Sequence, residues 1–303
     1  MKLTGSWIAI PTPFNSDDTI NFDTFRKLID FHQKYGTSGL LVLGSAGEAS
    51  MLNKTEKKEI IEFVSKYAKG KIPLFVGTTA SNTSETIVMT KFAKQCNADG
   101  ALMVVPGYIR PPQEAIYYFF KEVSSAVDIP IAVYNNPTRV GVNIIPETAI
   151  RLAKIPNIVA IKQAYPEVSH LIEIKKALGD DIDILPCDAP PYSIILPCLA
   201  IGGSGVTNIT GNLAPEEFAL LSKPWKNFDD VIKSRELVFK YYDLMKICYS
   251  VTNPVVIKAG LNLLGFSVGK PRLPLQELNQ EKTFKLKEIM EGLGLLRKYK
   301  VNE

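Results

Sequence analysis

The chain has 303 residues, of which 46% are hydrophobic and 22% are charged, as in an ordinary globular protein. Its 35 basic and 31 acidic side chains give a formal net charge of +4, which is too small and too evenly spread to favour binding to nucleic acid. Four cysteines without a CxxC pair and only two histidines exclude the usual zinc sites, so we expect no metal.

The sequence also lacks the usual signals for export and for membrane insertion. The segment from Met1 to Pro13 has only a short apolar run, without the long apolar core of a signal peptide. No apolar stretch approaches the roughly 18–20 residues that a spanning helix needs. We therefore expect a cytoplasmic protein with reduced cysteines and no contact with a membrane.

Short apolar runs alternate along the chain with longer amphipathic segments. The expected strands are Trp7–Ile10, Gly39–Leu43, Leu74–Val76, Ala101–Val105, Ile131–Val133, Ile158–Ile161, Ile182–Leu185 and Gly205–Asn208. The expected helices between and after them are Phe22–Tyr35, Lys57–Ala68, Ser84–Gln95, Gln113–Val127, Glu147–Lys154, Glu167–Leu178 and Tyr192–Ala200, with Thr55 as N-cap of the second.

The strand-sized runs are continuously apolar, which is typical of parallel strands buried on both faces. Eight strand–helix units in about 220 residues predict a (β/α)8 TIM barrel over residues 1–222. An open doubly wound sheet is the alternative, but no GxGxxG follows the first strand. Residues 223–303 predict only helices, at Phe228–Cys248, Pro254–Leu264 and Leu275–Leu295, and so a C-terminal helical region. Lysines near the end of the chain, including Lys298, are interleaved with apolar and acidic residues, as on a solvated helix face.

In such barrels the active site lies at the carboxyl ends of the strands. The sixth strand ends in Lys162, and a buried lysine that loses its proton is the nucleophile that forms a Schiff base with a carbonyl. The alternative is a lysine that reaches solvent or pairs with a carboxylate. Asp188 and Asn208 follow the seventh and eighth strands.

The neighbouring strand ends carry groups that suit a 2-oxo acid. Gly44–Gly47 offers backbone N–H groups beside the Ser45 hydroxyl, as a small cradle for a carboxylate, although an ordinary tight turn would have the same composition. Tyr134 can pass a proton if its hydroxyl belongs to a relay, and Arg139 offers a planar fork for a second carboxylate.

With these residues in place, the chain resembles the dihydrodipicolinate synthase and N-acetylneuraminate lyase superfamily of pyruvate-dependent class I aldolases. The resemblance runs over essentially the whole length. Its landmarks are Gly44–Glu48, Tyr134–Gly141, Ile161-Lys162, Gly202–Val206 and Asn253–Lys258.

The resemblance implies a role for each matching residue. Lys162 would form an imine with pyruvate, without any other cofactor, and Tyr134 and Ser45 would relay protons. Tyr108 would complete the relay in a neighbouring subunit of a homodimer or homotetramer. The amides of Ser45 and Ala46 would bind the pyruvate carboxylate, and Arg139 would bind the carboxylate of an aldehyde partner. The backbone of Gly205 and Val206 would line the pyruvate pocket.

Several residues depart from the family pattern. Ala46 replaces a second hydroxyl residue, with an expected loss of about 1 kcal/mol of carboxylate binding. Gln163 after the lysine resembles the neuraminate lyase branch. Gly107 replaces a tyrosine, and Lys54 and Lys57 replace residues that lie near the allosteric site of lysine-inhibited members, so we predict that lysine does not inhibit this protein.

Three functions follow as hypotheses. The first is condensation of pyruvate with L-aspartate semialdehyde in lysine and diaminopimelate biosynthesis, which Arg139 favours. The second is cleavage of a 2-keto-3-deoxy sugar acid or N-acetylneuraminate, which Gln163, Ala46 and the unusual Tyr165-Pro166 favour. The third is a degenerate binding or regulatory protein, against which the intact pair of Lys162 and Tyr134 argues.

Overall fold

The computed structural model describes residues 1–301. Its strands are β1 (Gly5–Ala9), β2 (Gly39–Val42), β3 (Leu74–Gly77), β4 (Gly100–Val104), β5 (Ile131–Asn135), β6 (Ile158–Gln163), β7 (Asp183–Pro186) and β8 (Gly205–Asn208). The helices that alternate with them are α1 (Phe22–Lys34), α2 (Lys54–Ala68), α3 (Thr83–Gln95), α4 (Gln113–Ala126), α5 (Pro137–Val140), α6 (Pro146–Ala153), α7 (Val168–Leu178), α8 (Ile195–Ala200) and α9 (Pro215–Leu221). Two short 3₁₀ helices lie at Ala49–Met51 and Thr210–Asn212, and the chain continues with α10 (Phe228–Cys248), α11 (Val255–Leu263), α12 (Gln280–Gly292) and α13 (Leu295–Tyr299).

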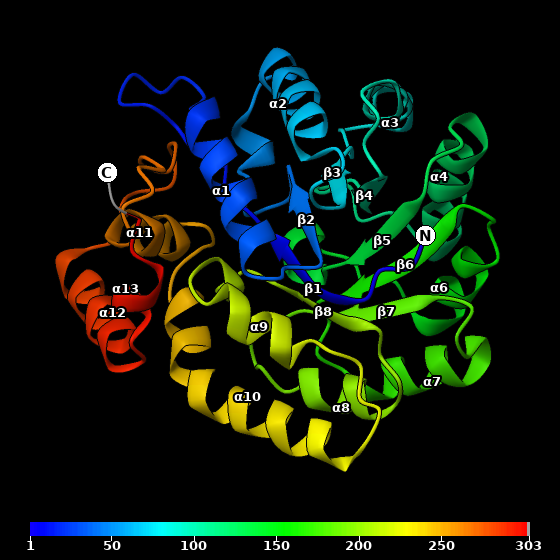
Figure 1. Ribbon diagram of the computed structural model, residues 1–303. Coiled ribbons are helices and arrows are strands. Elements are labelled where there is room, and N and C mark those ends of the chain that lie inside the picture. The colour runs from blue at the N-terminus through cyan, green and yellow to red at the C-terminus, as the bar shows by residue number, and fades with distance from the viewer. Residues whose placement is uncertain (302–303) are drawn as a thin grey trace.

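The eight strands form a closed parallel barrel. Each strand pairs with its neighbour in chain order from β1 to β7, and β8 pairs with β1 in the register Gly5↔Gly205 to Ile8↔Asn208. The last seam, between β7 and β8, is closed by a bridge between Cys187 and Thr207. Figure 1 shows the barrel at the centre with helices around it. The predicted (β/α)8 fold is confirmed.

The C-terminal helices pack against the barrel rather than apart from it. In Figure 1, α10 lies below α8 and α9, and α11 to α13 lie beside α1. The Phe31 ring of α1 contacts the rings of Phe266 and Tyr299 edge-on, at centroid distances of 4.8 and 5.7 Å. Glu217 of α9 accepts hydrogen bonds from Lys298 at 2.8 Å and from the Tyr299 hydroxyl at 2.6 Å. The division at residue 222 into two domains stays a prediction.

The structure corrects three local predictions. The N-cap of α2 is Asn53, not Thr55, because Asn53 and Glu56 form a reciprocal capping box with N···O distances of 3.0 and 2.8 Å. The predicted helix Leu275–Leu295 is shorter, because α12 begins after the N-cap Asn279 and Gly294, at φ +74°, separates it from α13. Lys298 does not lie on a purely solvated face, because it pairs with Glu216 and Glu217.

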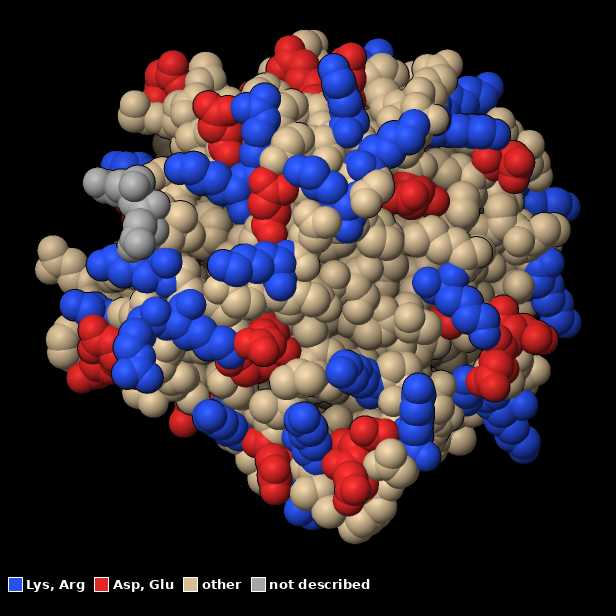
Figure 2. All heavy atoms as spheres, in the orientation of Figure 1, with Lys and Arg blue, Asp and Glu red and all other residues tan. Residues whose placement is uncertain are grey.

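In Figure 2, basic and acidic side chains are interleaved over the visible face. Within residues 1–301, no helix is both long enough and apolar enough to cross a membrane.

Candidate active site

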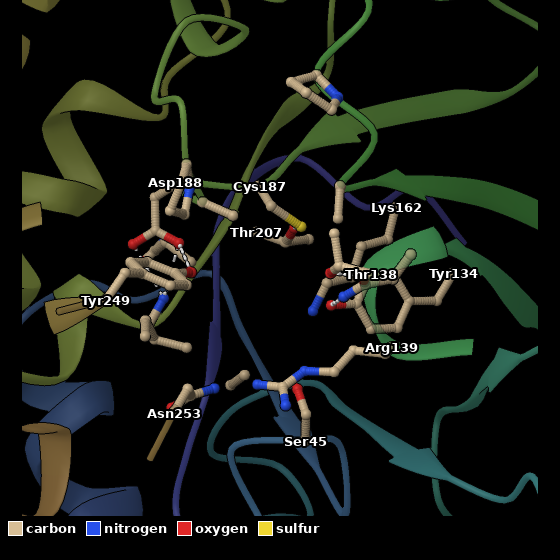
Figure 3. Close-up of a pocket in the computed structure, with 18 of the residues that line it drawn as sticks. Ser45, Tyr134, Thr138, Arg139, Lys162, Cys187, Asp188, Thr207, Tyr249 and Asn253 are labelled. Atoms are coloured by element: carbon tan, nitrogen blue, oxygen red, sulfur yellow. Dashed lines mark hydrogen bonds between the residues drawn. The ribbon is translucent and has the colours of Figure 1, made fainter. Parts of the chain in front are cut away.

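A cavity of about 430 Å³ lies at the carboxyl end of the barrel (Figure 3). Its walls come from the ends of β5 to β8, from the Ser45 loop after β2 and from the segment after α10. The lining residues used below are Ser45, Tyr134, Asn136, Thr138, Arg139, Lys162, Cys187, Asp188, Thr207, Asn208, Tyr249 and Asn253. This cavity therefore lies where the site was predicted, at the carboxyl ends of the strands.

Lys162 extends into this cavity from the end of β6. The amine is close to Tyr134, because the two residues are paired across β5 and β6, and its Nζ atom lies 4.1 Å from the centroid of the phenol ring. Only 7% of Lys162 is exposed. Within residues 1–301 this amine forms neither an ion pair nor a hydrogen bond. A buried amine without a carboxylate partner, aimed into a cavity, is available to react.

Tyr134 forms a hydrogen bond with Asn136, two residues further along the chain. Its hydroxyl oxygen accepts a hydrogen bond from Asn136 Nδ2 at 2.6 Å. Burial raises the pKa of this phenol, and the adjacent Lys162 ammonium and the Asn136 hydrogen bond oppose the rise. The hydroxyl of Ser45 lines the same cavity but forms no hydrogen bond to Tyr134 within the described chain.

The Gly44–Glu48 segment forms a tight loop after β2. Thr12 fixes it by donating a hydrogen bond from its hydroxyl to the Gly47 carbonyl at 2.6 Å, and Glu48 adopts a left-handed conformation at φ +54°. Within residues 1–301, the backbone N–H groups of Ser45 and Ala46 have no hydrogen-bond acceptor. Ala46 is 1% exposed and does not belong to the described set of residues that line the cavity.

Arg139 and Tyr108 occupy different positions. Arg139 belongs to the one-turn helix α5, and Figure 3 shows its guanidinium reaching across the cavity toward Ser45. Tyr108 is 98% exposed at φ +77° and does not line the cavity of its own chain. Its exposure means that any contribution of Tyr108 to a site has to be made to another molecule.

Gly205 and Val206 lie at the start of β8, away from the cavity. They pair with Gly5 and Ser6, near the amino end of β1, whereas the cavity is lined by Thr207, Asn208 and Ile209 further along. The two residues predicted to line the pocket therefore lie nearer the amino end of β8 than the residues that do line it. The family motif begins at the amino end of β8, whereas the cavity lies at the carboxyl end of the strand.

Cys187 is a cavity residue that the sequence analysis missed. Cys187 points toward Lys162 and Tyr134 (Figure 3), and its sulfur lies 3.2 Å from the Thr207 hydroxyl. Because the Thr207 hydroxyl donates its proton to the Pro186 carbonyl at 3.1 Å, the thiol is the donor to Thr207. Burial raises the pKa of Cys187, so the thiol is neutral. Cys187 follows directly after β7 and precedes Asp188, and this position at a strand end could have identified it as a cavity residue.

Asp188 and Tyr249 form a polar wall opposite Lys162. The Asp188 carboxylate accepts hydrogen bonds from the Tyr249 hydroxyl at 2.6 Å and from the hydroxyl and amide of Thr210 at 2.6 and 2.9 Å. Burial raises the pKa of Asp188, and the hydrogen bonds from Thr210 and Tyr249 oppose the rise. Asn253 also lines the cavity, and within the described residues its Oδ1 atom is buried without a partner. Tyr249 and Asn253 follow α10, outside the barrel strands, so the alternation of strands and helices does not predict their place in the cavity.

Gln163, the departure after the lysine, points away from the cavity. Successive residues of a strand face opposite sides, so Gln163 lies on the outer face of β6 when Lys162 lies on the inner face. Its Oε1 accepts a hydrogen bond from Asn135 Nδ2 at 3.0 Å, and Asn135 also bonds Asn143 at 2.8 Å. Gln163 thus belongs to a buried network outside the set of cavity residues.

Comparison with known proteins agrees with the fold. Residues 2–293 match the model of the dihydrodipicolinate synthetase family. The 4-hydroxy-tetrahydrodipicolinate synthase of Thermodesulfovibrio yellowstonii is 38% identical over 293 residues, which cover 97% of this chain and 99% of the relative. That of Caldicellulosiruptor bescii is 36% identical over 291 residues, which cover 96% of this chain and 97% of the relative. The crystal structure of dihydrodipicolinate synthase from Aquifex aeolicus has a TM-score of 0.91 and 36% identity, covering 97% of this chain and 99% of that one. The chain therefore belongs to the dihydrodipicolinate synthetase family.

Proposed function

We propose that this protein is a 4-hydroxy-tetrahydrodipicolinate synthase, a lyase that condenses pyruvate with L-aspartate semialdehyde through an imine on Lys162. The observation that carries the proposal is the unpaired, buried amine of Lys162, 4.1 Å from the ring of Tyr134, in a cavity that also holds the Ser45 loop and Arg139. Its relatives of that name are 36–38% identical over nearly the whole chain.

In the first half of the reaction, the Lys162 amine attacks the carbonyl carbon of pyruvate. The carbonyl oxygen leaves as water, and a protonated imine remains on Lys162. The unbonded amides of Ser45 and Ala46 bind the pyruvate carboxylate, which orients the carbonyl toward the amine. The Tyr134 hydroxyl, beside the amine, transfers the protons that this exchange requires.

In the second half, the imine loses a proton from the pyruvate methyl group and becomes an enamine. The enamine carbon attacks the aldehyde carbon of the second substrate, forming the new carbon–carbon bond, and the aldehyde oxygen takes up a proton. The amino group of the aldehyde substrate then displaces the lysine from the imine carbon, which closes the ring and frees Lys162. Arg139, the cationic group that reaches across the cavity, binds the carboxylate of this substrate.

The positions of the residues that differ from the family pattern favour this reaction over cleavage of a sugar acid. Gln163, Ala46 and Tyr165-Pro166 favoured the sugar-acid hypothesis from sequence, and of these only Pro166 belongs to the described lining of the cavity, where it offers no charged group. Arg139, which favours an acidic aldehyde partner, does line it. The reading as a degenerate binding protein is opposed by the adjacent Lys162 and Tyr134.

A homodimer or homotetramer in the cytoplasm completes the proposal. Tyr108 is almost fully exposed, and the adjacent Ile109 is 63% exposed, so this loop is free to enter a neighbouring subunit. There Tyr108 would join the relay of Tyr134 and Ser45. All four cysteines are free thiols, in keeping with a reducing compartment.

The imine is tested by incubating the protein with pyruvate and borohydride and then mapping the reduced adduct by peptide mass spectrometry. We expect a single modified peptide, containing Lys162, and no adduct in Lys162→Met. Absence of the adduct from the wild-type protein would remove the mechanism and favour the binding-protein alternative.

The second substrate is tested by comparing turnover of aspartate semialdehyde with turnover of a panel of keto-deoxy sugar acids. Arg139→Ala should reduce condensation by about 100-fold and leave the yield of the pyruvate adduct unchanged, because a lost charged hydrogen bond costs roughly 1.5–3 kcal/mol. The matched control is Arg151→Ala, which removes a surface arginine that pairs with Glu114. Equal losses in adduct and in condensation would assign Arg139 a structural role.

A further inference from the structure

We infer that Asn136 is a positioning residue for the reaction, which holds the Tyr134 hydroxyl so that its proton faces Lys162 and the substrate. The inference rests on the proposed function and extends it to a residue with no assigned role. Asn136 is 7% exposed, lines the cavity and donates a 2.6 Å hydrogen bond from Nδ2 to the Tyr134 oxygen.

The local sequence explains why the Asn136 side chain has this orientation. Asn136 precedes Pro137, which disfavours a helical backbone, and it has φ −141° and ψ 82°. It occupies the N-cap position of α5, yet its side chain makes no capping hydrogen bond there. The amide group is therefore free to bond elsewhere.

A second hydrogen bond determines which end of the Asn136 amide faces the phenol. The Thr138 hydroxyl donates to Asn136 Oδ1 at 2.7 Å. With its oxygen occupied by Thr138, the amide presents its NH₂ group to Tyr134. The order along the turn is thus Thr138 hydroxyl to Asn136 oxygen, then Asn136 nitrogen to Tyr134 oxygen.

This arrangement has a direct consequence for proton transfer. Because the phenol oxygen accepts from Asn136, its own hydrogen is left for a different acceptor. The Lys162 amine lies over the phenol ring, 4.1 Å from its centroid, and the Cys187 thiol also interacts with the hydroxyl. An N–H directed at the oxygen also stabilises the phenolate that remains after the proton has moved.

Within residues 1–301, Asn136 is the side chain that donates a hydrogen bond to the phenol oxygen. Ser45 makes no hydrogen bond to the phenol in residues 1–301, and Tyr108 is 98% exposed. The titratable or charged groups that face Tyr134 are Lys162, Cys187, Arg139 and Tyr249. Asn136 is the neutral donor among these neighbours, and so it acts on Tyr134 without adding charge.

The test compares Asn136→Val, Asn136→Asp and Thr138→Val with a control, Asn143→Ala. Asn143 carries an amide on the following segment that bonds Asn135 rather than Tyr134. The readouts are kcat and KM for pyruvate across pH, the rate and yield of the borohydride-trapped imine, and thermal unfolding.

We expect Asn136→Val to lower kcat and the rate of imine formation by about 10- to 100-fold, with KM for pyruvate changed by less than about threefold and the final yield of adduct unchanged. Asn136→Asp should lower kcat further at neutral pH and move the alkaline limb of the profile upward, because a carboxylate beside the phenol opposes its ionisation. Thr138→Val should have a smaller effect of the same kind. Asn143→Ala should lower the temperature of thermal unfolding and leave kcat and the rate of imine formation unchanged.

The inference is overturned if either Asn136 variant, once shown to be folded, keeps the wild-type kcat and pH profile. It is also overturned if kcat falls only in proportion to a loss of folded protein. A wild-type protein that forms no adduct with pyruvate would instead remove the proposed function, and this inference with it. The two failures are therefore distinguishable in one set of measurements.

Discussion

A buried ion pair links the Gly44–Glu48 loop, which we propose to bind the pyruvate carboxylate, to the C-terminal helices. Lys258 of α11 contacts the Glu48 carboxylate at 2.6 Å, and the two side chains are 1% and 0% exposed. The amine also donates to the Lys270 carbonyl at 2.9 Å, and the second Glu48 oxygen accepts from the Arg272 amide at 2.8 Å. Burial lowers the pKa of Lys258 to about 8 while Glu48 opposes the fall, so the amine is charged at pH 7.

Lys258→Met would leave the Glu48 carboxylate buried with the Arg272 amide as its remaining donor. Breaking a buried pair from one side costs about 3–5 kcal/mol, because the partner keeps its desolvation penalty without its counter-charge. Unfolding entropy of about 2 cal/mol/K per residue gives roughly 0.6 kcal/mol per degree for this chain, so Tm should fall by about 6 °C. Because Glu48 ends the Gly44–Glu48 loop, KM for pyruvate should rise as well.

Urea and thermal unfolding at pH 7 measure the loss. The double variant Glu48→Gln with Lys258→Met should recover part of it, with a coupling of about 2 kcal/mol, since both charges are then absent. The control Lys287→Met removes an exposed pair with Glu291 and should cost less than about 0.5 kcal/mol. If the free energy of unfolding falls by less than about 1 kcal/mol in Lys258→Met, the conclusion that Lys258 and Glu48 form a buried pair, in which each charge stabilises the other, is refuted.

Three further predictions concern other parts of the molecule. Burial lowers the pKa of His32 from 6.5 to about 4, so between these pH values the unfolded chain binds a proton that the folded chain does not. The free energy of unfolding should therefore decline by about 3 kcal/mol as the pH falls from 6.5 to 4. Replacing His32 should flatten this part of the curve of unfolding free energy against pH. Gly205→Ala should cost about 3 kcal/mol or more in urea unfolding, because the added Cβ would lie 2.1 Å from the Gly5 carbonyl oxygen, whereas Gly292→Ala, with no atom within 4 Å, should cost nothing. Millimolar lysine should leave the condensation rate unchanged, since Gly107 replaces a tyrosine of the inhibited members, and clear inhibition in that assay would contradict the sequence argument.

Much of the architecture could be predicted from the pattern of apolar residues. Parallel strands that are buried on both faces need continuous apolar runs, so the eight strands and their order were recognisable, and α10 has the predicted bounds, Phe228–Cys248. Lys162 was identifiable because it ends one of these runs. Helix ends were less accurate, because side-chain hydrogen bonds such as the one between Asn53 and Glu56 decide them, and several nearby residues could have served.

The candidate site itself required the tertiary structure. Lys162 lies beside Tyr134 because β5 and β6 pair in one register, and a shift by one residue would turn either side chain to the outer face. The same alternation places Gln163 outside the cavity, although it directly follows Lys162 in the chain. The bond from Asn136 to Tyr134 and the approach of Cys187 to Lys162 depend on backbone turns and on strand pairing across the barrel. The amino-acid sequence fixes which reactive side chains stand at the strand ends. Which of these side chains contact one another depends on packing, because the distance and direction between them are set by contacts between segments far apart in the chain.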